Sequence, residues 1–321
     1  MLSRRELLER AAVFTVAGLA CEAPVGAAAR LGRVGVALFT IPKLLDQDFT
    51  GALTLLADIG YKEVQFFGPY PFSDPTAHER WKSVSTSLGL RGSGFFGHSP
   101  KDVKAILDRT GLSAPAMHVD VGTLRARLGE AAEAAHALEM KYLGISAIPA
   151  DQRRTLDGYK RVADEFNDIG AKASKLGVRF TYHNHGYGWT ELEGQIPLRV
   201  VLERTDPALV IMEMDLFWTV AGGADPVELL DTYRGRYRLM HIKDMKQRVR
   251  FSGDGGDAAQ WIELFPFVTD AGSGVLDLPT ILSHAKTSGV EHFNLEQDLV
   301  ANPEESLRKG YQFLSRLDLQ P

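Results

Sequence analysis

The chain has 321 residues and a formal net charge of −5, from 36 Lys and Arg against 41 Asp and Glu. This acidic balance argues against nucleic acid as a partner, because binding to phosphate backbones requires an excess of clustered cations. Hydrophobic residues make up 45% and charged residues 24% of the chain, which excludes a largely disordered protein and predicts a buried core. The length fits two ordinary domains or one large α/β barrel.

The first 29 residues differ in pattern from the rest of the chain. Arg4 and Arg5 precede an apolar run over 11–20, and a stretch of small residues ends at Ala29. These parts resemble a twin-arginine export signal, so we predict cleavage near Ala29 and a periplasmic or otherwise exported product. The apolar run is too short to span a bilayer, so no stable membrane insertion is expected after cleavage. The alternative is an amphipathic first helix of a cytoplasmic protein. The single cysteine, Cys21, falls inside the predicted signal and suits an oxidising compartment.

Between residues 31 and 317, short apolar runs rich in β-branched residues alternate with longer helical patterns, which predicts a parallel sheet covered by helices. The runs expected to form strands are 34–39, 63–67, 114–119, 142–148, 178–183, 209–214, 238–242 and 292–296. Apolar spacings of three and four predict helices that include 49–59, 124–138, 159–176 and 278–288. Gly60, Gly177 and Gly289 each follow such a stretch, where a left-handed cap is needed. Eight strand–helix units favour a single-domain (β/α)8 TIM barrel over an open doubly wound sheet.

Two segments, near 69–91 and 246–266, are longer than ordinary connections and are predicted to be insertions in the barrel. The first is rich in Pro, Ser and aromatic residues, and the second contains a glycine- and aspartate-rich stretch followed by Trp261. Each is interpreted either as a lid over the site or as a decorated loop.

Residue types that bind metals close several of the predicted strands. They are His118, His183, His185, Asp215, His241 and Glu296. In a barrel, the carboxyl ends of all strands meet on the face where active sites lie. Imidazole and carboxylate ligands suit Mn, Co, Zn, Fe or Mg. We therefore predict one divalent metal ion, although any one of these residues taken alone is more often structural.

Five motifs are specific enough to indicate a family. They are Tyr-His-Asn-His at 182–185, Glu-Met-Asp-Leu-Phe-Trp at 213–218, Leu-Met-His-Ile-Lys-Asp-Met at 239–245, Gly-Ser-Gly-Val-Leu-Asp at 272–277 and Leu-Glu-Gln-Asp at 295–298. With them, the chain resembles the sugar phosphate isomerase/epimerase family over about residues 31–317. These are xylose isomerase-like TIM barrels, a superfamily that also includes the family 2 AP endonucleases. The resemblance implies a small-molecule sugar substrate and a divalent metal ion.

In this family, Glu, Asp, His and Glu at the ends of strands five to eight hold the metal. The resemblance therefore implies Asp215, His241 and Glu296 as the last three ligands. The first position departs from the pattern, because a histidine stands where relatives have glutamate. The fifth-strand ligand is then His183 or, less favoured, His185.

This substitution bears on the reaction, because family epimerases use two metal-bound glutamates as paired acid and base. Glu296 is predicted to remove the proton beside the substrate carbonyl, through an enediolate that the metal stabilises. His183 is predicted to return the proton if it is not a ligand. Lys243 is predicted to position an oxyanion, or else it is a surface charge. Glu213 lies one layer deeper than Asp215 on the same strand face and is expected to support a ligand rather than to be one.

The substrate is expected to be a neutral or oxidised sugar, because an exported enzyme would rarely meet sugar phosphates. His185, His118, Gln65 and Trp218 are predicted to bind it, and further aromatic side chains near the strand ends are expected to stack on the sugar ring. These further aromatic residues are Phe39, Phe66, Phe67 and Trp189.

The first functional prediction is a metal-dependent isomerase or epimerase that acts on a keto or hydroxyketo sugar. The alternatives are an exported lyase or hydratase acting on 3-keto glycosides, or a sugar-binding barrel without turnover. A phosphodiesterase like the AP endonucleases is disfavoured by the acidic charge and by the lack of further carboxylates at strands one to four. A homo-oligomer is compatible with the sequence.

Overall fold

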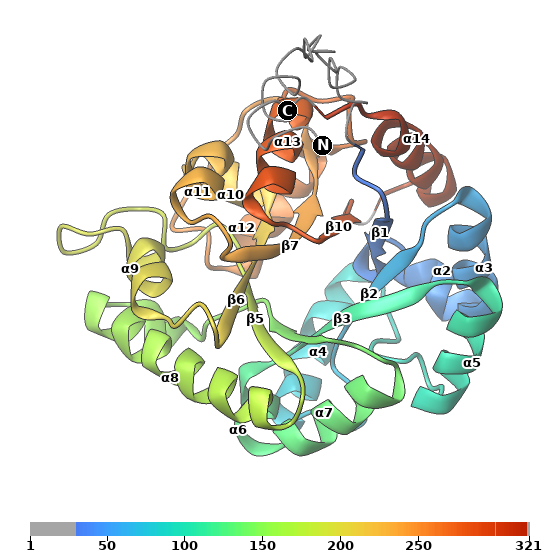
Figure 1. Ribbon diagram of the computed structural model, residues 1–321, viewed down its shortest axis with the longest axis horizontal. Coiled ribbons are helices and arrows are strands. Elements are labelled where there is room, and N and C mark those ends of the chain that lie inside the picture. The colour runs from blue at the N-terminus through green and yellow to red at the C-terminus, as the bar shows by residue number, and fades with distance from the viewer. Residues whose placement is uncertain (1–29, 299, 320–321) are drawn as a thin grey trace, which may run out of the picture.

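The computed structural model describes residues 30–298 and 300–319, so the predicted export signal at 1–29 lies outside the described residues. Its centre is a closed barrel of parallel strands in the spatial order β1-β10-β7-β6-β5-β4-β3-β2 (Figure 1). The predicted single-domain TIM barrel is confirmed. The strands are β1 (Val34–Ala37), β2 (Glu63–Phe67), β3 (Ser113–Val119), β4 (Tyr142–Ile145), β5 (Arg179–His183), β6 (Val210–Asp215), β7 (Tyr237–Ile242) and β10 (His292–Leu295).

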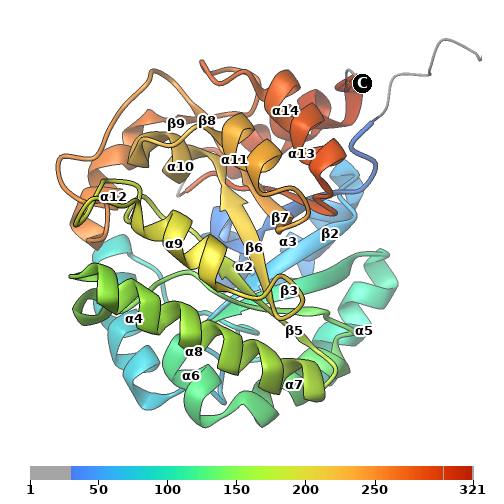
Figure 2. The ribbon, with the colours of Figure 1, turned by 60° about the vertical axis from the view of Figure 1, so that its left-hand side comes forward.

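Helices connect successive strands and surround the barrel (Figure 1). They are α2 (Pro42–Gln47), α3 (Phe49–Ile59), α5 (Pro100–Thr110), α6 (Val121–Ala126), α7 (Leu128–Ala137), α8 (Leu156–Lys175), α9 (Pro197–Arg204), α10 (Leu216–Gly222), α11 (Pro226–Thr232), α13 (Leu278–Ser288) and α14 (Pro303–Arg316). In Figure 2, α8 and α9 lie side by side, and an ion pair of 2.7 Å between Arg204 and Asp164 joins them. The three predicted glycine caps have positive φ, as a left-handed cap requires.

One predicted helix is two helices in the structure. The stretch 124–138 was expected to be continuous, but the chain leaves helical geometry at Arg127, with φ −137° and ψ 31°. α6 begins upstream of the predicted start, because the Asp120 side chain accepts a hydrogen bond from Thr123 N and caps the helix there. α7 then begins afresh after Arg127.

On β3, β4, β6 and β7 the barrel interior changes from apolar to polar along the strands. A cluster of Ala116, Tyr142, Ile211 and Leu239, each at most 1% exposed, forms the apolar part, whereas β2 and β10 contribute the ion pair of Glu63 and His292 near their amino-terminal ends. Strand side chains repeat every two residues on one face, so the next interior layer contains the residues two positions further on. On β3, β6 and β7 these are His118, Glu213 and His241, and on β4 the position is Gly144. A layer of ionisable groups therefore lies directly on an apolar plug.

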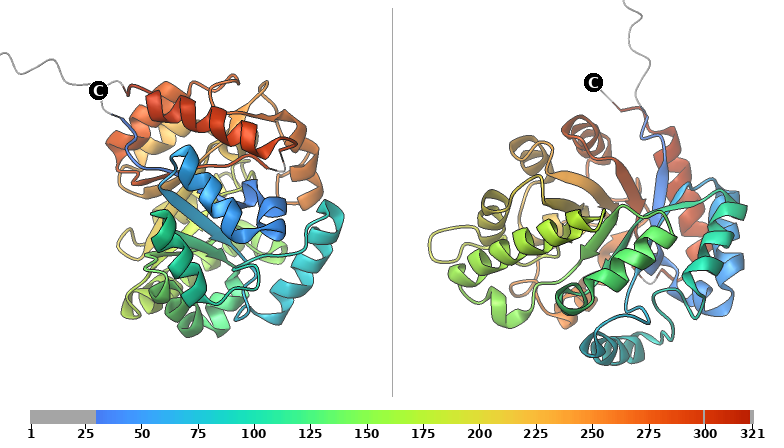
Figure 3. Two further views of the ribbon diagram at one scale, coloured as in Figure 1. Left: turned by 90° about the vertical axis from the view of Figure 1, so that its right-hand side faces the viewer. Right: turned by 60° about the horizontal axis from the view of Figure 1, so that its bottom comes forward.

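Both predicted insertions contain regular structure at the carboxyl-terminal end of the barrel. The first contains α4 (Pro75–Leu88), which stands out from the ring of helices in Figure 3. The second is bounded by the two-stranded ribbon of β8 (Asp244–Met245) and β9 (Val268–Thr269) and contains α12 (Ala258–Leu264) and η3 (Phe265–Phe267). Short 3-10 helices η1 (Leu38–Thr40) and η2 (Ala150–Arg153) follow β1 and β4. Among the described residues, no helix is both long and apolar enough to cross a membrane.

Candidate active site

A cavity of about 360 Å³ opens among the carboxyl ends of the strands. This volume is within the range of small-molecule sites. Its floor is polar, and its outer wall is largely apolar because α4 and the segment around α12 contribute to it. Lining residues of the floor include Gln65, His118, His183, His241, Lys243, Glu296 and Asp298, and those of the wall include Phe39, Phe67, Trp81, Val84, His185, Trp218, Trp261, Ile262 and Phe265.

Beneath the floor, Glu213 is the point on which three histidines converge. Its side chain is fully buried, and Oε2 lies 2.5 Å from His118 Nε2 and 3.4 Å from His183 Nδ1. Oε1 lies 3.3 Å from His241 Nε2 and accepts a 2.8 Å hydrogen bond from Gln65 Nε2. Burial opposes ionisation of Glu213, but the charges of His241 and His118 hold its pKa well below the usual value.

On the floor of the cavity, Lys243 neutralises a second group of acidic side chains. Its ammonium lies 3.0 Å from Asp215 Oδ2, 2.7 Å from Glu296 Oε2 and 2.9 Å from Asp298 Oδ2. Burial opposes this charge, but the three carboxylates raise the pKa of Lys243 well above its usual value. Burial also raises the pKa of Asp298 to about 6, while the ammonium opposes that rise. Lys243 is therefore a permanent buried cation rather than a surface charge.

The two histidines nearest the centre carry different charges. Burial, and then the charge of His241, lower the pKa of His183 to about 4, so its imidazole is neutral at physiological pH. Burial opposes the charge on His241 as well, but Glu296 and Glu213 raise its pKa to about 10. His241 Nδ1 lies 2.7 Å from Glu296 Oε2, and the ring thus joins the layer of Glu213 to the layer of Lys243.

Three of the four residues predicted to bind a metal form one group of donor atoms, and His183 lies beside it. His183 Nε2 lies 3.9 Å and His241 Nδ1 lies 4.0 Å from Asp215 Oδ2. Donor atoms of Asp215, His241 and Glu296 all lie within 4.8 Å of one another. A second such group consists of His118, His183, Glu213 and His241.

The chemistry of these donors fits a divalent ion. His183 Nδ1 is buried without a hydrogen bond of acceptable geometry among the described residues, and the same is true of Asp215 Oδ2, despite its ion pair with Lys243. Buried nitrogen and oxygen atoms in this state are costly unless an ion or ligand satisfies them.

The residues predicted to bind substrate also lie at the cavity. Gln65, His118, His185 and Trp218 all line it. His185 Nδ1 is hydrogen-bonded to the Ser146 carbonyl at 2.6 Å, which leaves its ring stacked on Trp261 with centroids 4.3 Å apart. This bond holds His185 to the segment after β4 and makes it a wall residue, whereas His183 points toward the other donors.

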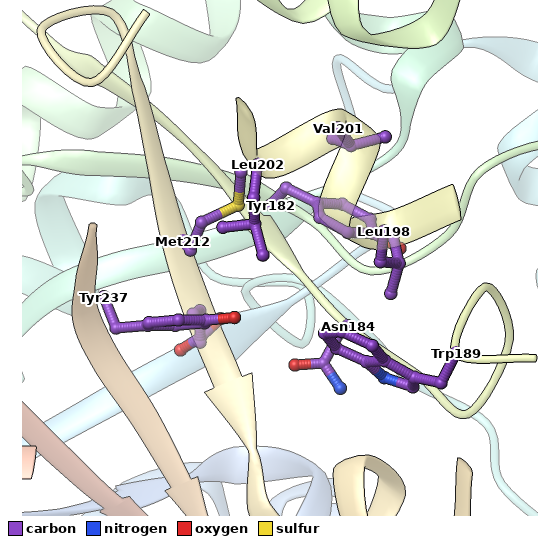
Figure 4. A pocket seen from close by; sticks show the side chains of 9 residues that line it. Tyr182, Asn184, Trp189, Leu198, Val201, Leu202, Met212 and Tyr237 are labelled. Carbon is purple, nitrogen blue, oxygen red and sulfur yellow. The ribbon is translucent and has the colours of Figure 1, made fainter. Parts of the chain in front are cut away.

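One aromatic prediction is wrong. Trp189 does not line the large cavity but a separate one of about 10 Å³, between α9 and the outer side of β5 and β6 (Figure 4). That space holds a single water molecule at most. The chain turns away from the barrel mouth after His185, which carries Trp189 outward to pack with Leu198 and Asn184.

Three residues are more prominent in the structure than the sequence predicts: no role is predicted for Asp298 or Trp261, and only a supporting one for Glu213. Asp298 ends the Leu-Glu-Gln-Asp motif at 295–298, and its spacing of two from Glu296 is the signal that both side chains lie on the same side. Trp261 was noted in the second insertion, but nothing in the sequence places that loop over His185. Glu213 was given a supporting position, and its contact with three histidines depends on strand register.

The fold and the site together define a class of protein. A family model described as xylose isomerase-like TIM barrel matches residues 53–317, and the chain belongs to this family. Its candidate site lies at the carboxyl ends of the barrel strands, and β5 ends there at His183.

Particular relatives show what this chain is similar to. Inosose dehydratase 2 of Bacillus cereus is 27% identical over 180 residues, which cover 53% of this chain and 59% of that protein. The chain thus spans about six-tenths of the length of that relative. A crystal structure of a sugar phosphate isomerase/epimerase from Parabacteroides distasonis ATCC 8503 superposes with a TM-score of 0.68 at 22% identity, covering 92% of this chain and 98% of the other. The structure of IOLI protein with a binding zinc atom has a TM-score of 0.62 at 15% identity and covers 89% and 99% of the two chains.

Proposed function

We propose that this protein is a divalent-metal-dependent enzyme that removes a proton beside the carbonyl of a sugar-like hydroxyketone. The observation that carries the proposal is that the carboxylate of Glu296 and the buried imidazole of His183 both lie on the floor of one cavity. Burial opposes ionisation of Glu296, but Lys243 and His241 hold its pKa well below the usual value. Glu296 is therefore ready to accept a proton at neutral pH.

The two proton-transfer groups are chemically unequal, and this bears on the type of reaction. Symmetrical epimerisation needs two comparable groups on opposite faces of one carbon, whereas isomerisation and β-elimination do not require two equivalent groups. The likeness to inosose dehydratases supports elimination of water or another leaving group as the second half of the reaction. We therefore favour a lyase of the dehydratase type over an epimerase.

The chain's own side chains would perform the proton transfers and hold the substrate. Glu296 takes the proton from carbon, and the Lys243 ammonium, 2.7 Å away, stabilises negative charge that develops on the neighbouring oxygen. His183 would exchange a proton with the departing or returning group only through the ring nitrogen that does not bind the ion. A divalent ion would polarise the carbonyl and so acidify the adjacent C–H bond. The donor atoms available to hold it belong to His183, Asp215, His241 and Glu296 and to the neighbouring His118 and Glu213.

The cavity wall supports a neutral or oxidised sugar as substrate. Among the described lining residues, the cations besides histidine are Arg80 and Lys243, and Lys243 is already neutralised by three carboxylates. A phosphate group would find little positive charge there. Trp218 and Trp261 offer flat apolar surfaces for a sugar ring. With export as a further part of the proposal, a 3-keto glycoside is the substrate class to test first.

The decisive experiment is exchange of substrate C–H for deuterium in D2O, followed by NMR over a panel of inososes, 3-keto glucosides and simple ketoses. Protein loaded with Mn²⁺ or Co²⁺ should exchange one proton beside the carbonyl, and protein treated with EDTA should not. Glu296→Gln should lower the rate by about 10²–10⁴-fold, whereas Glu133→Gln, an exposed site on α7, should not change it. Exchange that survives both EDTA and Glu296→Gln would refute the proposal. Sugar binding without any exchange or metal dependence would favour a binding protein.

A further inference from the structure

We infer that this chain binds its divalent ion one layer deeper in the barrel than the family resemblance implies, at His118, His183, Glu213 and His241. The four side chains come from β3, β5, β6 and β7, and their donor atoms all lie within 4.8 Å of one another. The catalytic role of an ion at this deeper site rests on the proposed function.

The spacing of the three imidazole rings matches a shared metal. The ring centroids are separated by 5.0 Å for His118 and His183, 4.6 Å for His183 and His241, and 5.6 Å for His118 and His241. Metal–nitrogen bonds of 2.0–2.1 Å in a tetrahedral arrangement place two ring centroids about 5.2 Å apart. The rings thus stand where three ligands of one ion would stand.

The carboxylate completes the same arrangement. Glu213 lies 3.4 Å from His183 Nδ1 and 3.3 Å from His241 Nε2, and tetrahedral ligand atoms around one ion are about 3.3 Å apart. Its 2.5 Å distance to His118 Nε2 is shorter and would lengthen when an ion enters. Three imidazoles and one carboxylate form a site for Zn, Mn, Fe, Co or Ni.

Burial gives an independent reason for a ligand at this place. Glu213 is 0% exposed, and His183 and His241 are each 2% exposed. His183 Nδ1, aimed at Glu213, makes no hydrogen bond of acceptable geometry among the described residues. The Gln65 amide contacts His118, His241 and Glu213 in the structure. An ion at this position would displace that amide and leave it as a neighbour that orients the ligands.

The shallower position is already occupied by a positive charge. Asp215 and Glu296 would be ligands there, but the Lys243 ammonium lies 3.0 Å and 2.7 Å from their oxygens. Lys243 is 2% exposed and also contacts Asp298 at 2.9 Å. A divalent ion bound to the same oxygens would lie within a few ångströms of this ammonium, where like charges repel strongly. The deeper group contains none of the oxygens that Lys243 contacts. His241 would release its ring proton when the ion binds, and Glu296 stays free to act as the base.

Metal affinity in matched variants distinguishes the two positions. Full-length protein is stripped with chelator and titrated with Co²⁺, and affinity, bound metal after dialysis and the Co²⁺ absorption spectrum are recorded. We expect His118→Ala and Glu213→Gln to weaken Co²⁺ binding by more than the roughly 10–100-fold that loss of an outer-shell partner costs. Asp215→Asn should change it by less than about 10-fold, and Glu296→Gln, whose side chain contacts the ligand His241, by less than about 100-fold. Circular dichroism and thermal melts establish that each variant is folded, and His118→Ala suffices if Glu213→Gln does not fold.

A loss of Co²⁺ binding in Asp215→Asn or Glu296→Gln as large as that in His118→Ala would overturn the deeper site. Wild-type protein that binds no Co²⁺, Mn²⁺ or Zn²⁺ would overturn it as well. Failure of the proposed function is a separate result. Wild-type protein that binds Co²⁺ through His118 and Glu213 but exchanges no substrate proton retains the metal site and refutes only the reaction.

Discussion

Replacing Lys243 with methionine removes the ammonium that neutralises Asp215, Glu296 and Asp298. Methionine keeps much of the side-chain volume, so the change acts mainly on charge. Removing one partner of a buried ion pair costs about 3–5 kcal/mol, because the remaining charge stays buried without compensation. With about 2 °C of Tm per kcal/mol in a chain of this size, the melting temperature of the metal-free protein at pH 7 should fall by about 6–10 °C.

The matched control is Lys246→Met, three residues further along. Lys246 is exposed, and its ammonium donates a 2.7 Å hydrogen bond to the Pro266 carbonyl, so its loss should change stability by about 0.5 kcal/mol or less. Differential scanning calorimetry of both variants in EDTA measures the contrast. A melting temperature for Lys243→Met within about 2 °C of the control would refute the assignment of Lys243 as the buried counter-ion.

Three further predictions concern pH, packing and the cavity wall. The pKa of His241 in the folded protein, about 10, is above its value in the unfolded chain. Protonated His241 therefore stabilises the folded state fully below pH 6.5, and this stabilisation is lost as the pH rises toward 10. His183, with a folded pKa of about 4, instead destabilises the folded state as the pH falls below 6.5. The Tm of metal-free protein should therefore fall between pH 6.5 and 10, and a fall equally steep in His241→Gln would contradict this. Gly35→Ala should lower the free energy of unfolding in guanidinium by about 1–3 kcal/mol, because the added Cβ would overlap the Asn294 side-chain oxygen on β10. The control is Gly129→Ala, where the added Cβ meets nothing within 4 Å. Equal losses in the two variants would refute the packing argument. Trp261→Ala should raise KM about 10-fold with little change in kcat if the ring only stacks on substrate, and an unchanged KM would remove it from the site.

The barrel could be predicted because its strands are short apolar runs separated by capped helices. The run predicted at 63–67 is β2 in full, whereas the run at 142–148 extends beyond β4, which ends at Ile145. Ile148 is buried, but its N–H bonds to the Tyr187 hydroxyl instead of a neighbouring strand. Apolar composition indicates burial, and it does not reveal which backbone groups pair.

The candidate site was predictable in its residue types but not in its layering. The period of two along a strand places Glu213 and Asp215 on the same face, and their motif was recognised. Which partners they meet depends on register, and the structure pairs Glu213 with His183 and Asp215 with His241 across neighbouring strands. A register shift between Met212 and Glu213 further sets the height of this strand against β7. No local pattern in the sequence encodes that shift.

The division between strands and insertions has a practical meaning for redesign. The ionisable side chains are anchored on the sheet, whereas much of the entrance is supplied by α4 and α12, which are attached through loops after β2 and β7. Trp81 and Ile262 can be varied without touching a backbone segment that carries a histidine of the site. Combinatorial libraries confined to these two helices should therefore alter which substituents on a ring are admitted while the reaction at its carbonyl stays the same.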